Sequence, residues 1–140
     1  MTQSIHELSS EEITRLEAQR KWVREHYEPA AQKNYETVKG KVRLIAAIIG
    51  NAWIEPHETI KLQSLGVSLG DAIAQELGLE WVAVEDEFGR DPALILRGTS
   101  IKIFPVTMIS KRIERGEQVD AVEMFGNTCK TILEIKREGA

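Results

Sequence analysis

The chain has few of the features on which secreted and membrane proteins depend. It contains a single cysteine, Cys129, so no internal disulfide can form and nothing indicates an oxidising compartment. Cys129 falls on an apolar stripe of the last predicted helix, where we expect an inert core thiol. The longest apolar run, residues 44–49, is far below the roughly 20 residues of a membrane span. Residues 1–10 lack a signal-peptide pattern, so we expect a cytoplasmic protein that contacts no membrane.

The chain also lacks an excess of basic over acidic residues. The chain has 18 Lys and Arg against 22 Asp and Glu, a net charge of -4. Proteins that bind nucleic acids usually carry a basic footprint, because neutralising phosphates supplies most of their affinity. We therefore expect no nucleic-acid partner. With 140 residues, 42% of them hydrophobic, the chain has the length and composition of a single globular domain spanning residues 1–140.

The first half of the sequence has the periodicity of amphipathic helices. Ser9 and Glu12 have the Ser-x-x-Glu spacing of a capping box, which marks a helix start. Apolar residues then recur at intervals of three or four, and Gly78 supplies a left-handed cap after the last of them. The predicted helices run from the capping box to before Pro29, over about residues 35–53 and over about residues 56–77.

The pattern then changes to that of strands. Residues 80–85, 92–96 and 101–104 are apolar segments separated by short glycine-containing turns, which predicts a three-stranded antiparallel meander. Two more helices follow, one opened by Pro105 and the other capped by Asp120. The fold class is therefore α+β, with three N-terminal helices, the three-stranded antiparallel meander and two C-terminal helices.

Small residues form a stripe on the third predicted helix. Gly66, Gly70 and Ala74 recur every four residues. Each mid-helix glycine costs about 1 kcal/mol relative to alanine, so we expect another part of the backbone to approach closely there. The same stretch places Ser68 in a G-x-S-x-G pattern, the nucleophile elbow of hydrolases. That motif needs a strand-to-helix turn and a later histidine, whereas Ser68 lies within a helix and all three histidines precede it, so we reject the hydrolase interpretation.

Two charged clusters carry the candidate site residues. Residues 85–91 form an acidic hairpin that fails the calcium-loop pattern, because Phe88 and Arg90 stand where oxygen ligands are needed. Lys111, Arg112 and Arg115 form a basic cluster on the fourth helix. Three roles are open to these cations: ion pairs with the hairpin, binding of a small anion, or stabilisation of the helix C-terminus through its dipole. No His or Cys has a zinc-ligand spacing. We predict no catalytic, cofactor-binding or metal-binding residues.

The first two predicted strands are apolar on both faces. Trp81 and Ala83 point to one face of the first strand, and Val82 and Val84 point to the other. Such a strand is either sandwiched between layers or covered by a partner molecule. Trp81 is accordingly either a core residue or an interface residue.

Two segments resemble a known family. Residues 81–91 match W-x-x-x-E-D-E-x-G-R-D, and residues 104–112 match F-P-x-x-M-I-S-K-R. Together they resemble a family of small bacterial domains of unknown function, over roughly residues 65–116. The resemblance implies a bacterial, cytoplasmic α+β domain and carries over no catalytic residue or ligand. Phe88 stands where that family has tyrosine as often, which removes one hydroxyl donor.

These observations favour a non-enzymatic protein-binding or self-associating module, either a homodimer or an immunity-type protein whose acidic face blocks a basic partner. The predicted interaction surface consists of Trp81, Asp86, Glu87, Arg90, Lys111 and Arg112. The alternative is a small-molecule binding protein or enzyme that holds an anionic ligand with Arg90, Lys111 and Arg112. In a third interpretation the charges serve only solubility and the two segments encode only the fold.

Overall fold

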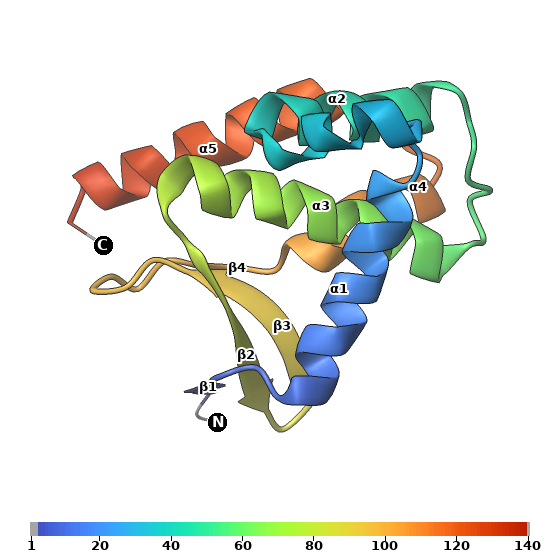
Figure 1. Ribbon diagram of the computed structural model, residues 1–140. Helices are drawn as coiled ribbons and strands as arrows, with labels where there is room; N and C mark the ends of the chain where they lie inside the picture. Colours follow the sequence, from blue (N-terminus) through green and yellow to red (C-terminus); the bar gives the residue numbers. More distant parts are fainter. Residues whose placement is uncertain (1–2, 140) are drawn as a thin grey trace.

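The structure, a computed structural model that describes residues 3–139, is α+β: helices pack on one face of an antiparallel sheet (Figure 1). In chain order the elements are β1 (Ser4–His6), α1 (Ser10–Arg24), the 3₁₀ helix η1 (Pro29–Glu36), α2 (Val38–Gly50), α3 (Thr59–Leu77), β2 (Glu80–Asp86), β3 (Gly89–Ile95), β4 (Lys102–Ile103), the 3₁₀ helix η2 (Pro105–Thr107), α4 (Met108–Glu114) and α5 (Ala121–Arg137). None of the helices within residues 3–139 has both the length and the apolar character needed to cross a bilayer.

Within residues 3–139 the sheet has four strands in the order β1-β2-β3-β4, all antiparallel. The predicted meander is confirmed as β2, β3 and β4. The expected number of three strands was wrong, because β1 adds a fourth strand along the free edge of β2. Its three residues are all exposed and too few to show a strand pattern, so only its pairing with β2 makes it a strand.

The predicted helix caps are confirmed. The Ser9 hydroxyl accepts a hydrogen bond from the Glu12 amide at 3.1 Å, and the Glu12 carboxylate accepts one from the Ser9 amide at 2.8 Å. Gly78 ends α3 with a φ of 73°, a conformation that a side chain disfavours. These caps set where α1 begins and where the chain turns from α3 into β2.

The helix boundaries between Pro29 and Pro56 differ from the prediction. Residues 29–36 form the 3₁₀ helix η1, and α2 begins only at Val38, where the Thr37 hydroxyl accepts from the Gly40 amide at 2.9 Å. Gly40 also lets η1 approach, since a Cβ there would lie 1.7 Å from the Asn34 carbonyl oxygen. Further along, the predicted helix opened by Pro105 is divided into η2 and α4.

Helix α3 is the centre of the helical layer and contacts α1, α2, α4, α5 and η2. The expected close approach at its small-residue stripe is confirmed. A Cβ at Gly66 would lie 2.2 Å from the Val106 carbonyl oxygen, and one at Gly70 would lie 2.6 Å from the Trp81 ring. The two glycines therefore allow η2 and β2 to pack directly on the α3 backbone.

Both faces of the central strands are buried. Trp81 and Leu94, which pair across β2 and β3, belong to the main core beneath the helices. Val82, Val84 and Ala93 form a second, smaller cluster on the opposite face. The side chain of Lys102 in the edge strand β4 donates a hydrogen bond to Gln3, beside the other edge strand β1. The sheet is therefore curled over this second cluster.

Candidate functional site

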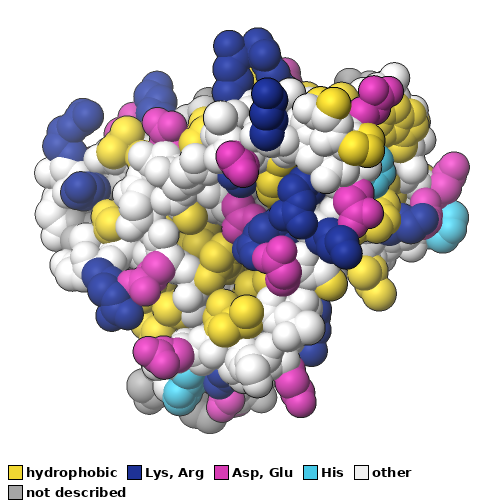
Figure 2. All heavy atoms as spheres, viewed as in Figure 1, with side chains coloured by type: hydrophobic (Ala, Val, Ile, Leu, Met, Phe, Trp, Pro, Cys, Tyr) yellow, Lys and Arg dark blue, Asp and Glu magenta, His cyan; other side chains and the backbone are white. Residues whose placement is uncertain are grey.

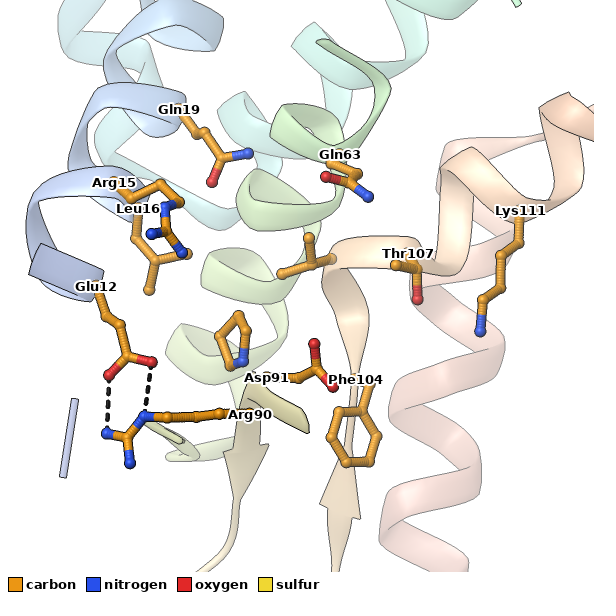
Figure 3. Close-up of a pocket in the computed structure, with 12 residues that line it drawn as sticks. Glu12, Arg15, Leu16, Gln19, Gln63, Arg90, Asp91, Phe104, Thr107 and Lys111 are labelled. Carbon is orange, nitrogen blue, oxygen red and sulfur yellow. Dashed lines mark hydrogen bonds and ion pairs between the residues drawn. The ribbon is translucent and has the colours of Figure 1, made fainter. Parts of the chain in front are cut away.

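The two segments that carry the family resemblance meet at one groove, here called the motif groove. It has a volume of about 450 Å³ and lies between α1, α3, β3 and the segment that leads through η2 into α4 (Figure 3). Helix α1 contributes Glu12, Arg15 and Gln19, β3 contributes Arg90 and Asp91, and residues 104–111 form the far wall. The groove therefore joins parts of the chain that are almost 100 residues apart.

Arg90 is held by an acidic partner at one end of the motif groove. Its Nε and one terminal nitrogen each donate to the Glu12 carboxylate at 2.9 Å, and that nitrogen also donates to the Glu7 carbonyl at 3.1 Å. The hydrogen bond from Arg90, followed by that from the Ser9 amide, lowers the pKa of Glu12 to about 2. The same contact raises the pKa of Arg90. The pair is neutral overall and leaves Arg90 largely occupied.

Three other charges in the motif groove have no such partner. Within residues 3–139, Arg15, Asp91 and Lys111 form no ion pair and no side-chain hydrogen bond. Figure 3 shows Arg15 and Lys111 on opposite sides, with Asp91 and Phe104 between them. The Phe104 side chain is 38% exposed. Two free cations, one free anion and an exposed ring are thus available to an outside molecule.

The edge of β3 beside the motif groove is poorly suited to pairing with an added strand. Strand β4 pairs only with Leu94 and Ile95, so in the described part of the chain the preceding half of β3 has no strand partner on that side. Pro92 lies in this half and has no N–H to donate. Proline on an exposed edge is a common protection against strand addition. Recognition in the groove would therefore rest on side chains.

Trp81 lies under the helices instead of in the motif groove. Its indole Nε1 donates to the Asp71 carboxylate of α3 at 2.9 Å. Asp71 also accepts two hydrogen bonds from Arg20 of α1, at 2.5 and 2.9 Å. Burial alone would lower the pKa of Arg20, but the ion pair with Asp71 outweighs it and raises that pKa. Trp81 thus packs against the core and fastens β2 to two helices.

Asp86 and Glu87 belong to the hairpin tip, defined here as residues 86–89. The Asp86 carboxylate accepts from the Phe88 amide at 2.8 Å, which holds the turn. Glu87 and Phe88 point into solvent, and Phe88, at 89%, is the most exposed large hydrophobic side chain in the described part of the chain. The tip directly precedes Arg90 and Asp91, so it adjoins the motif groove.

Arg112 faces away from the motif groove. One of its terminal nitrogens donates to the Met108 carbonyl of its own helix at 2.9 Å, and the side chain lines a separate hollow with Glu123. Of the six residues predicted as an interaction surface, the structure brings Arg90 and Lys111 to the groove and places Asp86 and Glu87 beside it. Arg90, Lys111 and Arg112 do not converge on one point.

The reactive side chains elsewhere are buried or engaged. Ser68 lies in α3 and shares a 2.6 Å hydrogen bond with Tyr35, whose pKa burial raises to about 12. The structural interpretation of Ser68 is therefore confirmed. Cys129 is buried, as expected, and burial raises its pKa. Among residues 3–139 no group of three or more His, Cys, Asp or Glu side chains is placed to hold a metal ion.

The predicted surface lacked the other charged residues of the motif groove and its aromatic ring, namely Glu12, Arg15, Asp91 and Phe104. Asp91 and Phe104 lie in the two matching segments, and their polar or aromatic character beside a turn was the available signal. Glu12 was predicted only as a capping residue, and Arg15 lies on the polar side of an amphipathic helix. Nothing in the sequence places α1 beside β3, so this wall of the groove depends on the tertiary fold.

The comparisons with known proteins agree with the family resemblance. A family model described as a domain of unknown function, DUF3806, matches residues 41–125. The chain belongs to this family. The DUF3806 match includes both segments of the motif groove, whereas α1 precedes it. No curated protein matches the chain.

A solved structure shares the fold. It is a crystal structure from Bacteroides thetaiotaomicron VPI-5482, with a TM-score of 0.71 and 16% sequence identity. The similarity covers 91% of this chain and 47% of that chain, so this DUF3806 protein spans about half the length of its structural neighbour. At this level of identity the comparison shows the fold alone.

Proposed function

We propose that the chain is a non-enzymatic protein-binding module and that the motif groove is its binding surface. The observation that carries the proposal is the meeting of the two matching segments at one groove. The groove joins free charges to an exposed aromatic ring, and protein interfaces combine aromatic anchors with a polar rim in this way. The face drawn in Figure 2 carries intermixed acidic and basic side chains, which suits a protein partner better than a polyanion.

The chemistry of the motif groove supports binding in preference to catalysis. Its lining includes no histidine, cysteine or serine. A general acid or base works best when its pKa lies near the working pH, whereas Glu12, with a pKa of about 2, stays ionised and paired with Arg90. Glu12 is therefore held as a structural charge, and the groove offers charge and shape to a partner.

Affinity capture with matched variants tests this proposal. The tagged wild-type chain, a groove variant combining Phe104→Ala with Lys111→Glu, and a control Lys130→Glu are used to capture proteins from bacterial lysate. Lys130 is an exposed residue of α5 outside the groove, so the control makes the same charge change elsewhere. We expect a stoichiometric partner with the wild type and the control only, while circular dichroism shows all three folded. Identical capture by all three would contradict the proposal.

An anionic small molecule is the second candidate, favoured by the two unpaired cations Arg15 and Lys111 in the same groove. Asp91 lies between them and Arg112 faces elsewhere, so the geometry supports this candidate less well. Thermal shift assays with inorganic phosphate and citrate test it. A rise in melting temperature that Lys111→Glu abolishes would favour an anion site, and no shift would leave the protein partner as the better explanation.

A further inference from the structure

We propose that the motif groove binds the hairpin tip of a second copy of this chain, so that two copies form a reciprocal dimer. This inference rests on the proposed function, because it names the partner of the same groove. It starts from two features that have no partner among residues 3–139: the hairpin tip and the free charges of the groove.

The hairpin tip has the properties of an inserted segment. Phe88 is 89% exposed although burying an aromatic side chain is strongly favourable. Asp86 and Glu87 directly precede it in the chain, and the bond from the Phe88 amide to the Asp86 carboxylate holds the turn in one conformation. A tip that is already ordered loses little conformational entropy on binding. It therefore presents an exposed aromatic ring next to the exposed carboxylate of Glu87.

The motif groove has the complementary properties. Arg90 and Glu12 neutralise each other, so the charges left are the cations Arg15 and Lys111 and the anion Asp91. Cations therefore outnumber anions among the unpaired side chains of the groove, even though the whole chain has a net charge of -4. Phe104 offers a half-exposed ring within the groove. An acidic tip with an aromatic ring matches both the charge and the apolar surface.

The position of the two features makes them self-complementary. The hairpin tip leads directly into Arg90 and Asp91, which line the motif groove. When a surface carries a protruding feature and its complement side by side, a two-fold axis can place each tip in the groove of the other copy. We assign the contact between Glu87 and the second copy's Lys111 as the ion pair that orients the tips. Every such contact then occurs twice in the dimer.

The contact area limits the strength of this dimer. The interface of the dimer consists of two small contacts, each between one turn and one groove. Interfaces below about 1,200 Å² in total are usually weak and transient. We therefore expect monomer and dimer to exchange, with dissociation on dilution. Because the contact joins opposite charges, higher ionic strength is expected to weaken it.

Sedimentation velocity from about 1 to about 500 µM, where small interfaces dissociate, tests the proposal. Three single variants are compared with the wild type: Phe88→Ala, Glu87→Lys and Lys111→Glu. We expect each to weaken dimerisation at least about tenfold, because the altered contact occurs twice. The double variant combining Glu87→Lys with Lys111→Glu should restore it, since the ion pair is rebuilt with its charges exchanged. Glu87 and Lys111 are exposed, so the fold tolerates these changes.

Lys130→Glu is again the matched control and should dimerise like the wild type. A wild type that stays monomeric over the whole range overturns the inference, and so does a dimer unaffected by Phe88→Ala or a double variant that fails to recover. Affinity capture distinguishes failure of the dimer from failure of the proposed function. If a monomeric wild type still captures a different protein through the motif groove, only the dimer is wrong; if it captures nothing, both proposals fail.

Discussion

Glu12 shows how much one side chain can do in this fold. One of its carboxylate oxygens accepts from the Ser9 amide, which starts α1, and both oxygens accept from Arg90 of β3. The sequence predicts the first role from the Ser-x-x-Glu spacing. The second depends on α1 lying beside the sheet, which local pattern does not reveal. The same carboxylate therefore caps a helix and fastens that helix to a strand.

The double role of Glu12 predicts a pH-dependent stability. Its pKa is about 2 in the folded chain, below the ordinary value of 4.5, so its contribution is complete above about pH 4.5 and is lost as the pH falls towards 2. Glu12→Gln should lower the melting temperature by a few degrees at pH 7, and this difference should shrink between pH 4.5 and pH 2. Thermal denaturation followed by circular dichroism at a series of pH values measures it.

Glu11→Gln is the control for this prediction. Glu11 lies in the same first turn of α1 but is exposed and forms no ion pair among the described residues. Its melting curve should follow that of the wild type within about a degree at every pH. If Glu12→Gln and the wild type lose stability in parallel as the pH falls, the Arg90 contact contributes nothing.

At the scale of elements, the strongest patterns were the most predictive. Helix α3 was recognised because its apolar stripe continues over many turns, and β2 and β3 were recognised because each contains a continuous apolar run next to a turn. Elements with little periodicity were missed or misplaced: β1 has three exposed residues, and η1 forms where Gly40 lets the chain pack against the start of α2. These short elements exist because of their neighbours, so a local pattern cannot reveal them.

The small-residue stripe of α3 gives the prediction at this scale. Gly66→Ala would place a Cβ 2.2 Å from the Val106 carbonyl oxygen, and because that neighbour is backbone, either η2 or α3 has to shift. We expect the free energy of unfolding to fall by about 2–3 kcal/mol, a typical cost of overpacking. Urea denaturation followed by circular dichroism measures this change.

A second glycine provides the matched comparison. Gly126 also lies inside a helix, α5, but a Cβ there would meet nothing within 4 Å. Gly126→Ala should therefore raise the free energy of unfolding by about 0.5–1 kcal/mol, the gain expected from helix propensity alone. Opposite signs at the two positions would support close packing at Gly66, and equal stabilisation would show that α3 and η2 are not in contact there.

At the scale of the whole molecule, the fold class was predictable and the motif groove was only partly so. The change from helical to strand periodicity indicated α+β, and the two matching segments drew attention to residues 81–91 and 104–112. That these segments share a groove with α1 follows from the packing of η2 against Gly66 and from the pairing of Arg90 with Glu12. Such contacts join residues that are distant in the sequence, so no periodic pattern of residue types reveals them.

Asp71 joins the helical layer to the sheet and gives the prediction for the whole molecule. Its carboxylate accepts from Arg20 of α1 and from the Trp81 indole of β2, and its side chain is only 12% exposed. Asp71→Ala leaves both donors without their partner and should lower the free energy of unfolding by about 2–3 kcal/mol. This is less than the cost of breaking a fully buried ion pair, because Arg20 retains some contact with solvent. Asp71→Asn keeps an acceptor for the indole and should cost less.

Asp91→Ala is the control for this prediction. It removes an unpaired carboxylate and should change the free energy of unfolding by less than about 0.5 kcal/mol. Urea denaturation of the three variants would refute this role for Asp71 if Asp71→Ala proved as mild as Asp91→Ala.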